Sequence, residues 1–232
     1  MPGMFPQATS SNSPIIGRSP GGEDPFLNLE EVNQQRADSP AAKEIEHRSI
    51  AVLPFVDMSP GGDVEYLGDG LADTLLHVLA QINGLKVAAR TSSFAFRDKD
   101  RLIGDIAREL GVAHVLEGSI QQAGGQIRVI AQLIEAETGS HLWSRTYTGA
   151  MEDLFQFQDE IAGEVVTTLQ VTLLESEEDQ LRNRYRPSIP VYDELVLGRH
   201  EMGKGTVAGL QAAVGHFQRA IELDPNYALP NV

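Results

Sequence analysis

The stretch of sequence that decides the fold is VAHVLEGSIQQAGGQIRVIAQLIEAETGSHLWSRTY, residues 112–147. Turns at residues 123–126 and 137–140 divide it into three segments, and both contain glycine, which supplies the positive φ angles that a tight hairpin needs. In the middle segment the side chains alternate between two faces, a period of two that is typical of a β-strand. Both faces carry apolar residues, and three strands cannot bury them alone. The stretch therefore predicts a three-stranded meander that packs against helices.

A second apolar run, SIAVLPF at residues 49–55, precedes the meander. Its length and composition are typical of a buried strand. Pro54 cannot donate a ladder hydrogen bond, so we expect it at the end of the strand or at a bulge. Residues 57–63 are interpreted as a loop, and Asp63 is the expected N-cap of the helix that follows.

Residues 64–82 predict an amphipathic helix, because their large apolar side chains recur at spacings of three and four. Gly68 and Gly70 each cost about 1 kcal/mol relative to alanine, whereas each buried large apolar side chain contributes roughly 1.5–3 kcal/mol. Burial outweighs the glycines, and Gly84 is expected to end the helix. Residues 85–90 predict a second strand, parallel to the first through a right-handed crossover.

Two further helices are expected around the meander. Residues 91–96 are interpreted as a loop, after which Asp98 or Asp100 can cap a short helix that Gly111 stops. Asp153 can begin the other helix after the meander. The apolar stripe of that helix consists of Leu154, Phe157, Ile161, Val165, Leu169 and Leu173.

These elements give an α/β (α+β) fold in the order β-α-β-α-β-β-β-α, with a mixed sheet of about five strands flanked by helices. We assign this domain to residues 49–175. Residues 1–48 are rich in proline, glycine, serine and glutamine and predict a disordered leader. Residues 176–190 are charged and then contain two prolines, which is typical of a linker or of an extension of the preceding helix.

Residues 191–232 predict a truncated helical hairpin that resembles a tetratricopeptide repeat. Helical segments at 191–202 and 207–223 are joined by a short glycine-rich loop. The resemblance is carried by the spacing of Ala213, Phe217, Ala220 and Pro225. Small residues let two helices approach each other, the phenyl ring fills the groove, and the proline terminates the hairpin.

The first helix of this hairpin departs from the repeat pattern. Gly198 lies about three residues earlier than a standard repeat would place it, so an unrelated helical hairpin is the alternative. One repeat cannot form a stable solenoid. Residues 228–232 look like the opening of another repeat, and we expect the natural protein to continue.

Residues 198–204, GRHEMGK, resemble the G-x-x-x-x-G-K of a phosphate-binding loop. That motif requires serine or threonine next and a strand in front. Here the next residue is Gly205, and no strand is expected before the motif. We therefore interpret the segment as a loop between helices and not as a nucleotide site.

The titratable side chains do not gather into a recognisable reaction site. The six histidines show no metal-ligand spacing. Glu65, Asp69 and Asp73 share one helix and are interpreted as a solvated face, and Ser92 and Ser93 lack a nucleophile elbow. The sequence therefore predicts no catalytic, cofactor-binding or metal-binding residue, and no cofactor.

Trp143, Arg145 and Tyr147 fall on one face of the last predicted strand. Such an aromatic–cationic–aromatic row is a possible interaction surface. The alternative, which we favour, is that the rings pack beneath a helix as part of the core.

The net charge of −15 opposes broad contact with nucleic-acid phosphates or anionic lipid. The absence of cysteine excludes disulfides and thiolate chemistry. No apolar run approaches the length of a membrane span, and the N-terminus lacks the basic start and apolar core of a signal peptide. We expect a cytoplasmic protein that does not bind nucleic acid, and its oligomeric state stays open.

Six stretches, in the order IAVLPF, YLGDGLADTLL, VAARTSSFAF, IARELGVAHVLEGSI, IRVIAQLIEAETGSHLWSRTY and DLFQFQDEIA, resemble the TolB N-terminal-like (FlgO-like) domain. The resemblance covers about residues 49–174 and implies a compact α/β domain in bacterial proteins that carry tetratricopeptide repeats behind it. In that family the domain is an accessory or interaction module and not an enzyme. It is often joined through a membrane span to an N-terminal adenylate cyclase domain or winged-helix DNA-binding domain.

This chain departs from the family arrangement in front of the domain. The segment before Ser49 is too short and polar for a cyclase, and neither a membrane span nor a winged helix is expected in it. The resemblance implies a periplasmic location as the alternative, if an upstream membrane anchor is missing.

The sequence thus predicts a non-enzymatic interaction or scaffold module that binds a protein or peptide through the groove of a repeat solenoid. The alternative is a sensory domain that binds a small ligand between the helices and the sheet. Such a domain would regulate an adenylate cyclase or transcription regulator outside this chain. A nucleotide-dependent enzyme would rest on the incomplete Gly-Lys loop alone.

Overall fold

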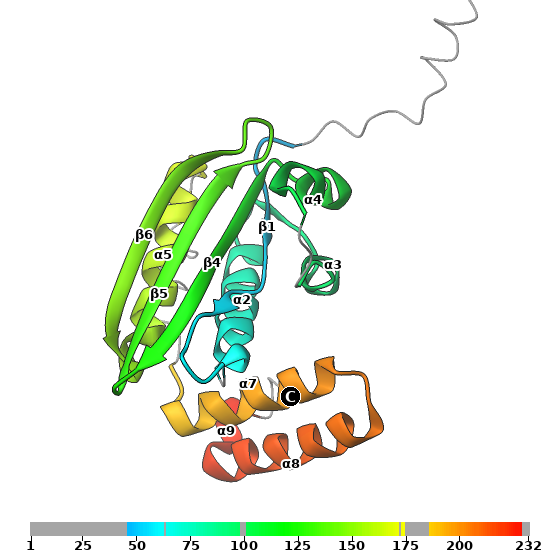
Figure 1. The fold of residues 1–232 in the computed structure, drawn as a ribbon, viewed down its shortest axis with the longest axis vertical. Helices are drawn as coiled ribbons and strands as arrows, with labels where there is room; N and C mark the ends of the chain where they lie inside the picture. Colours follow the sequence, from blue (N-terminus) through cyan, green and yellow to red (C-terminus); the bar gives the residue numbers. More distant parts are fainter. Residues whose placement is uncertain (1–45, 63, 98–100, 172, 175–185, 229–232) are drawn as a thin grey trace, which may run out of the picture. The chain divides into compact units, whose positions relative to one another are not determined.

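The computed structural model describes residues 46–62, 64–97, 101–171, 173–174 and 186–228 (Figure 1). All of these residues fall within one unit, Lys43–Val232. Several sequence-based expectations lie outside the described residues: most of the leader 1–48, the caps Asp63, Asp98 and Asp100, most of the linker 176–190, and the repeat opening at 229–232.

The predicted mixed sheet is confirmed, with six strands among the described residues where about five were expected. The path β3-β1-β4-β5-β6 is formed by Lys86–Val87, Ser49–Val52, His114–Ala123, Gln126–Glu135 and Ser140–Ala150. β1 lies parallel to β3 and β4, while β4, β5 and β6 form the antiparallel meander. Gly124, Gly125 and Gly139 have positive φ angles in the two turns, as the glycine pattern predicted.

The sixth strand, β2 (Val56–Asp57), lies where a loop was expected to begin. It pairs with β4 beyond the end of β1. Val52 is opposite Leu116 and Val56 is opposite Ser119. An advance of four residues from β1 to β2 therefore corresponds to an advance of three residues along β4. Pro54 therefore lies in the break between β1 and β2, just past the end of β1, which agrees with its missing N–H. A two-residue strand has no pattern of its own and forms because β4 offers it a partner.

The helices α2 (Glu65–Ala80) and α5 (Leu154–Thr168) lie side by side on one face of the sheet (Figure 1). They bury the main core against one set of alternating strand residues, which includes Leu116, Ile120 and Leu133. The helix α4 (Ile103–Leu110) packs against the other set through a smaller cluster. Gly111 ends α4 in the left-handed conformation, as expected.

Four sequence-based expectations about the bounds of elements were wrong. The expected loop at 91–96 contains a short helix, α3 (Arg90–Phe94), and the strand expected over 85–90 has only two paired residues. α2 ends at Ala80 with Gln81 as its C-cap, so Gly84 occupies a later turn and does not cap the helix. α5 stops at Thr168, before the end of its predicted stripe, because consecutive threonines are poor helix formers.

The helical hairpin is present, with α7 (Ile189–Gly203), α8 (Val207–Leu223) and a short α9 (Pro225–Ala228). Pro190 lies in the first turn of α7 and not in a linker, and its fixed φ suits that position. Thr206 caps α8 by accepting a hydrogen bond from the Gly209 amide at 3.0 Å.

Candidate functional site

The helix α7 packs across α2 and contributes to the main core (Figure 1). Tyr192 and Val196 on α7 are both buried there. The phenol of Tyr192 accepts a hydrogen bond from Gln158 at 3.2 Å, and its ring meets Phe155 edge-on at 5.1 Å between centroids. Burial raises the pKa of Tyr192. The hairpin and the α/β domain therefore share one core.

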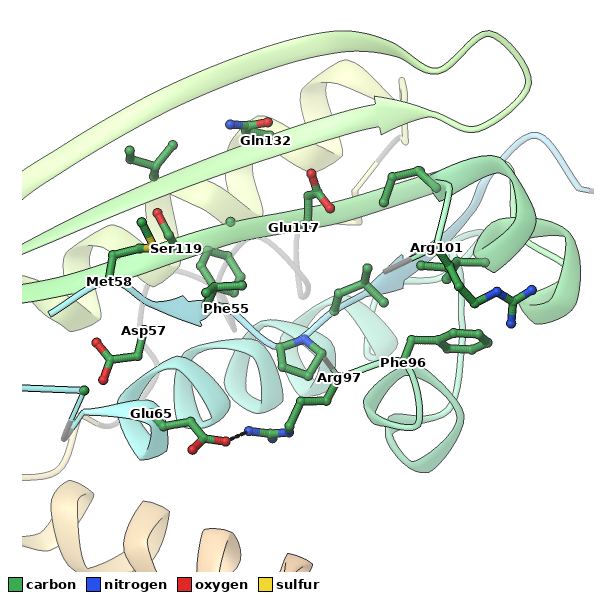
Figure 2. A pocket seen from close by; sticks show the side chains of 18 residues that line it. Phe55, Asp57, Met58, Glu65, Phe96, Arg97, Arg101, Glu117, Ser119 and Gln132 are labelled. Atoms are coloured by element: carbon green, nitrogen blue, oxygen red, sulfur yellow. Dashed lines mark hydrogen bonds and ion pairs between the residues drawn. The ribbon is translucent and has the colours of Figure 1, made fainter. Parts of the chain in front are cut away.

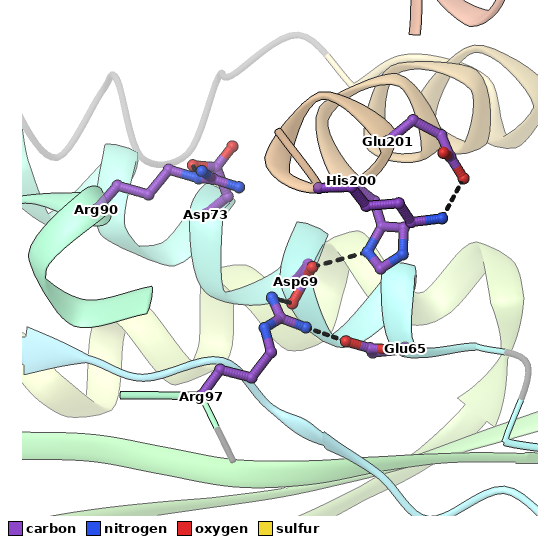
Figure 3. A network of polar contacts seen from close by, with 8 residues as sticks. Glu65, Asp69, Asp73, Arg90, Arg97, His200 and Glu201 are labelled. Atoms are coloured by element: carbon purple, nitrogen blue, oxygen red, sulfur yellow. Dashed lines mark hydrogen bonds and ion pairs between the residues drawn. The ribbon is translucent and has the colours of Figure 1, made fainter. Parts of the chain in front are cut away.

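A polar network surrounds this contact and is centred on α2 (Figure 3). Arg97 donates hydrogen bonds to both Glu65 and Asp69, which lie one turn apart. His200 of α7 approaches the other oxygen of Asp69, with its Nδ1 at 3.0 Å. Burial alone would lower the pKa of Arg97, but the two carboxylates outweigh it and raise that pKa.

Asp73 extends the network by another turn of α2. Its Oδ2 accepts a hydrogen bond from Arg199 of α7 at 2.6 Å. Its Oδ1 lies 2.8 Å from Nε of Arg90, an ion pair whose angle does not meet hydrogen-bond geometry. Arginines from two separate segments thus converge on the acidic row of one helix.

The prediction of a solvated acidic face was wrong for the middle of this row. Asp69 is only 4% exposed, and a buried carboxylate is costly unless it is paired and hydrogen-bonded. Arg97 and His200 supply those partners from positions 28 and 131 residues away in the sequence. Spacing within one helix cannot reveal such partners.

Glu65, Asp69 and His200 also present potential metal-ligand atoms within 4.8 Å of one another. Residue spacing could not predict this group, because the histidine is on another helix. Arg97 contacts both carboxylates, so its single positive charge already offsets part of their negative charge in this arrangement.

A cavity of about 820 Å³ lies beside the network (Figure 2). It is bounded by β2, by the face of β4 and β5 that α2 and α5 leave uncovered, and by the segment that carries α4. Its apolar lining includes Pro54, Phe96, Ile103, Ile106 and Ile130. Such a volume is within the usual range of small-molecule sites.

Polar side chains enter this cavity from paired positions of the meander (Figure 2). Glu117 lies opposite Gln132, and Ser119 lies opposite Ile130, so all four share one face. Burial raises the pKa of Glu117, an effect that the nearby His141 partly opposes.

The cavity and the network share two residues. Glu65 and Arg97 line the cavity and are also the part of the network next to Asp69. Through Asp69 this pair is in contact with His200 of α7. A molecule that contacts Arg97 in the cavity would therefore be linked to α7 through two hydrogen bonds, Arg97–Asp69 and Asp69–His200.

The predicted row on β6 lies on the α5 side of the sheet. Tyr147 is 9% exposed and its ring centroid is 5.5 Å from that of Phe157. Arg145 pairs with Glu164 of α5 at 3.1 Å, and Trp143 packs against the main core. A recognition role for this row stays a prediction. In that role, α5 would have to move so that a partner could reach this face of the sheet.

The hairpin residues lie between α7 and α8. Ala213 and Ala220 are buried, and Phe217 lies directly over Gly198, where a β-carbon would come within 2.4 Å of its ring. Pro225 begins α9. The assignment of these residues to the packing positions of a tetratricopeptide repeat stays a prediction.

The prediction that the phosphate-loop-like segment is a loop between helices was wrong. Residues 198–203 belong to α7 and do not form a loop. The lysine that follows, Lys204, pairs with Glu201 at 2.6 Å.

Sequence reasoning missed Arg97, Arg199, His200, Glu117 and Gln132. The available signal was indirect: Gly68, Gly70 and Ala72 lie beside the acidic row of α2. Small residues on a second side of a helix indicate that another segment approaches it closely.

Two solved structures illustrate the likeness of this fold to known proteins. TolB from Acinetobacter baumannii matches 55% of this chain and 29% of its own, with 14% identity and a TM-score of 0.41. The C-terminal domain of LpoB from Salmonella enterica matches 52% of this chain and 92% of its own, with 18% identity and a TM-score of 0.37.

A curated relative from Rhizobium meliloti (strain 1021), "Putative adenylate cyclase 3", is 39% identical over 180 residues. The match covers 78% of this chain and 31% of the relative, so the chain spans about a third of that protein's length. Residues 46–164 match the family described as HilA/YgeH-like transcriptional regulator, second domain. Because this match covers 119 of the 232 residues, the chain belongs to the HilA/YgeH-like transcriptional regulator second-domain family.

Proposed function

We propose that this chain is a non-enzymatic interaction module of a larger bacterial signalling protein, in which the α/β domain anchors a tetratricopeptide-like hairpin. The hairpin is held in place by the core contacts of Tyr192 and Val196 and by the ion pairs around α2. A hairpin fixed in this way can present one helix face without moving relative to its domain.

The observation that carries this proposal is an uncovered apolar strip on α8. Val207, Leu210 and Val214 are 75%, 50% and 54% exposed. Their spacing of three and four places them on one side of the helix, beside the side that packs on α7. Exposed apolar residues that cluster on a rigid helix indicate a contact surface.

The occupant that fits this strip is the apolar face of another helical hairpin, as in a stack of repeats. Two observations support it. The resemblance to a tetratricopeptide repeat rests on α8 itself, and the curated relative is about three times as long as the matched region. Stacked hairpins form a concave groove, which in our proposal binds a protein or peptide.

Point variants test this better than deletion of the hairpin, because deletion would also remove Tyr192 and Val196 from the core. In a pull-down from the source organism, Leu210→Glu combined with Val214→Glu should abolish capture of a specific protein. Ala208→Glu combined with Ala212→Glu, which adds the same two charges at exposed positions on another side of α8, should retain it. Equal capture by all three proteins, with unchanged circular dichroism, would refute the role of the strip.

A sensory domain is a second candidate, favoured by the cavity that shares Glu65 and Arg97 with the hairpin network. A ligand in this cavity would alter contacts that lead through Asp69 to α7. A thermal-shift screen with small metabolites checks this, since a ligand that binds only the folded state raises the melting temperature. The regulated output would be a cyclase or transcription regulator outside this chain.

We attribute no cyclase or nucleotide chemistry to this chain, and calorimetry with ATP should show no binding heat. Within the part of the chain that the structure describes, no helix has the length and apolar character needed to cross a bilayer. A cytoplasmic location stays our prediction, with a periplasmic one as the alternative. The net charge of −15 supports partners other than nucleic acid.

A further inference from the structure

We propose that the cavity on the uncovered face of β4 and β5 binds a small organic cation: an amine with an apolar body, whose ammonium group contacts the Glu117 carboxylate. This inference deepens the second candidate function, because it names the ligand class of the cavity. It rests on which of the charged side chains that line the cavity already have ion-pair or hydrogen-bond partners.

Among the residues that the structure describes, the two arginines that line the cavity are both paired with carboxylates. Arg97 is held by Glu65 and Asp69. Arg101 donates to Glu109 at 2.6 Å, and its guanidinium lies 5.3 Å from the centre of the Phe96 ring. An anionic ligand would have to break these pairs before it gained a cationic partner.

The carboxylates that face the cavity differ in whether they already have hydrogen-bond or ion-pair partners. Asp57 accepts hydrogen bonds from the amides of Ser59 and Val64, at 2.7 and 2.9 Å. Among the described residues, Glu117 is not hydrogen-bonded or ion-paired at contact distance, and only His141 opposes its charge from further away. Glu117 is therefore the charge that a ligand could satisfy.

The surroundings of Glu117 suit an amine with an apolar body. Ile103, Ile106 and Ile130 line the cavity beside it. Ser119 and Gln132 lie on the same face of the sheet and offer further hydrogen-bonding groups. An ammonium on a half-buried carboxylate makes a charge-assisted hydrogen bond, while the apolar body covers the isoleucines. The net charge of −15 also attracts cations to the protein.

Three probes with the same phenylethyl body and different charge test the proposal: phenethylamine, 2-phenylethanol and 3-phenylpropionate. Isothermal calorimetry on the complete chain at neutral pH, up to about 10 mM of each probe, measures their relative affinity. We expect the amine to bind about tenfold more tightly than the alcohol and the carboxylate not to bind.

Two variants locate the site. Glu117→Gln keeps the shape of the side chain and should reduce amine binding to the level of the alcohol. Glu152→Gln removes the same charge from an exposed position outside the cavity lining and should bind as the original protein does. Equal binding of amine and alcohol, no binding of any probe, or unchanged amine binding in Glu117→Gln would overturn the proposal.

Hydrogen exchange separates this inference from the sensory function. If the amine binds through Glu117 but the protection of α7 does not change, the ligand class stands and the sensory role falls. If a metabolite of another class binds this cavity and changes that protection, the sensory role stands and the amine assignment falls.

Discussion

Gly70 of α2 lies against Val196 of α7 so closely that a β-carbon at position 70 would come within 2.5 Å of the valine Cγ1. The same added β-carbon would lie 3.0 Å from the hydroxyl oxygen of Tyr192. This packing of α7 side chains against the backbone of α2 joins the α/β domain to the hairpin. It explains why a glycine that weakens an isolated helix is useful here.

Gly70→Ala should destabilise the protein by about 1–3 kcal/mol, because an added methyl group overpacks a filled core. The strain falls on α7, so limited proteolysis should cut the hairpin sooner. The measurement is the free energy of unfolding in urea. Gly163→Ala in α5 is the matched control, since nothing lies within 4 Å of the new carbon; it should gain about 0.5–1 kcal/mol. Equal stability of the two variants would contradict the close approach.

Asp69→Asn should cost about 2–3 kcal/mol, because the change removes a buried charge and leaves the guanidinium of Arg97 with a weaker partner. Asp105→Asn removes an exposed carboxylate that pairs with Arg108 at 2.6 Å, and it should change stability by less than about 0.5 kcal/mol. Urea denaturation of both variants gives the comparison. A loss no greater for Asp69→Asn than for Asp105→Asn would mean that the network contributes no more than a surface ion pair.

The neighbours Asp193 and Glu194 should respond to pH in opposite directions. Burial, with the nearby Glu194, raises the pKa of Asp193 to about 6, above the value of about 3.9 expected in the unfolded chain. The folded state then binds more protons between these values, so stability from this group is full below about pH 4 and is lost as the pH rises through 6. Asp193→Asn should therefore add about 1–2 kcal/mol at pH 8 and little at pH 4.

Burial would raise the pKa of Glu194, but hydrogen bonds from Arg219 and His216 outweigh it and lower that pKa. Its stabilising effect is present above the unfolded pKa and is lost as the pH falls through the folded one. Glu194→Gln should therefore destabilise the protein at pH 8 and much less at pH 3. Melting curves of the original protein and both variants across this range check the signs. A parallel response of the two variants to pH would contradict them.

Gly198→Ala should loosen the hairpin by about 1–3 kcal/mol, because its β-carbon would press on the ring of Phe217 at 2.4 Å. Replacing the ring by the smaller Phe217→Leu should reduce that cost, which a double-mutant cycle measures as a favourable coupling. Gly215→Ala on α8 is the control, since its nearest neighbour would be an Arg219 nitrogen at 3.6 Å. Additive effects of the Gly198 and Phe217 changes would show that the added methyl group at position 198 does not contact the ring of Phe217.

The meander could be predicted because its signals are local. Glycine fixes the turns at Gly125 and Gly139, and the alternation of side chains fixes the strands between them. The short elements β2 and α3 could not be predicted in this way. β2 exists through its pairing with β4, and α3 occupies a polar segment that its own residues do not require to be helical.

The candidate site was harder to predict than the fold. Glu65, Asp69 and Asp73 lie on one side of a helix by spacing alone, and spacing cannot show whether that side faces solvent or arginines from other segments. Glu117 and Gln132 could be assigned to strands, but the cavity in front of them requires the segment of α4 as its other wall.

The order of the main strands and helices, the two glycine turns and the apolar faces of α2 and α5 were determined by the sequence, because backbone preferences and side-chain periodicity act over a few residues. The tertiary structure decided which distant segments meet: Val196 against Gly70, and His200 beside Asp69. Such contacts depend on whether two surfaces far apart in the chain match in shape and charge. A glycine that looks like a weakness within one helix then becomes the place where another helix fits.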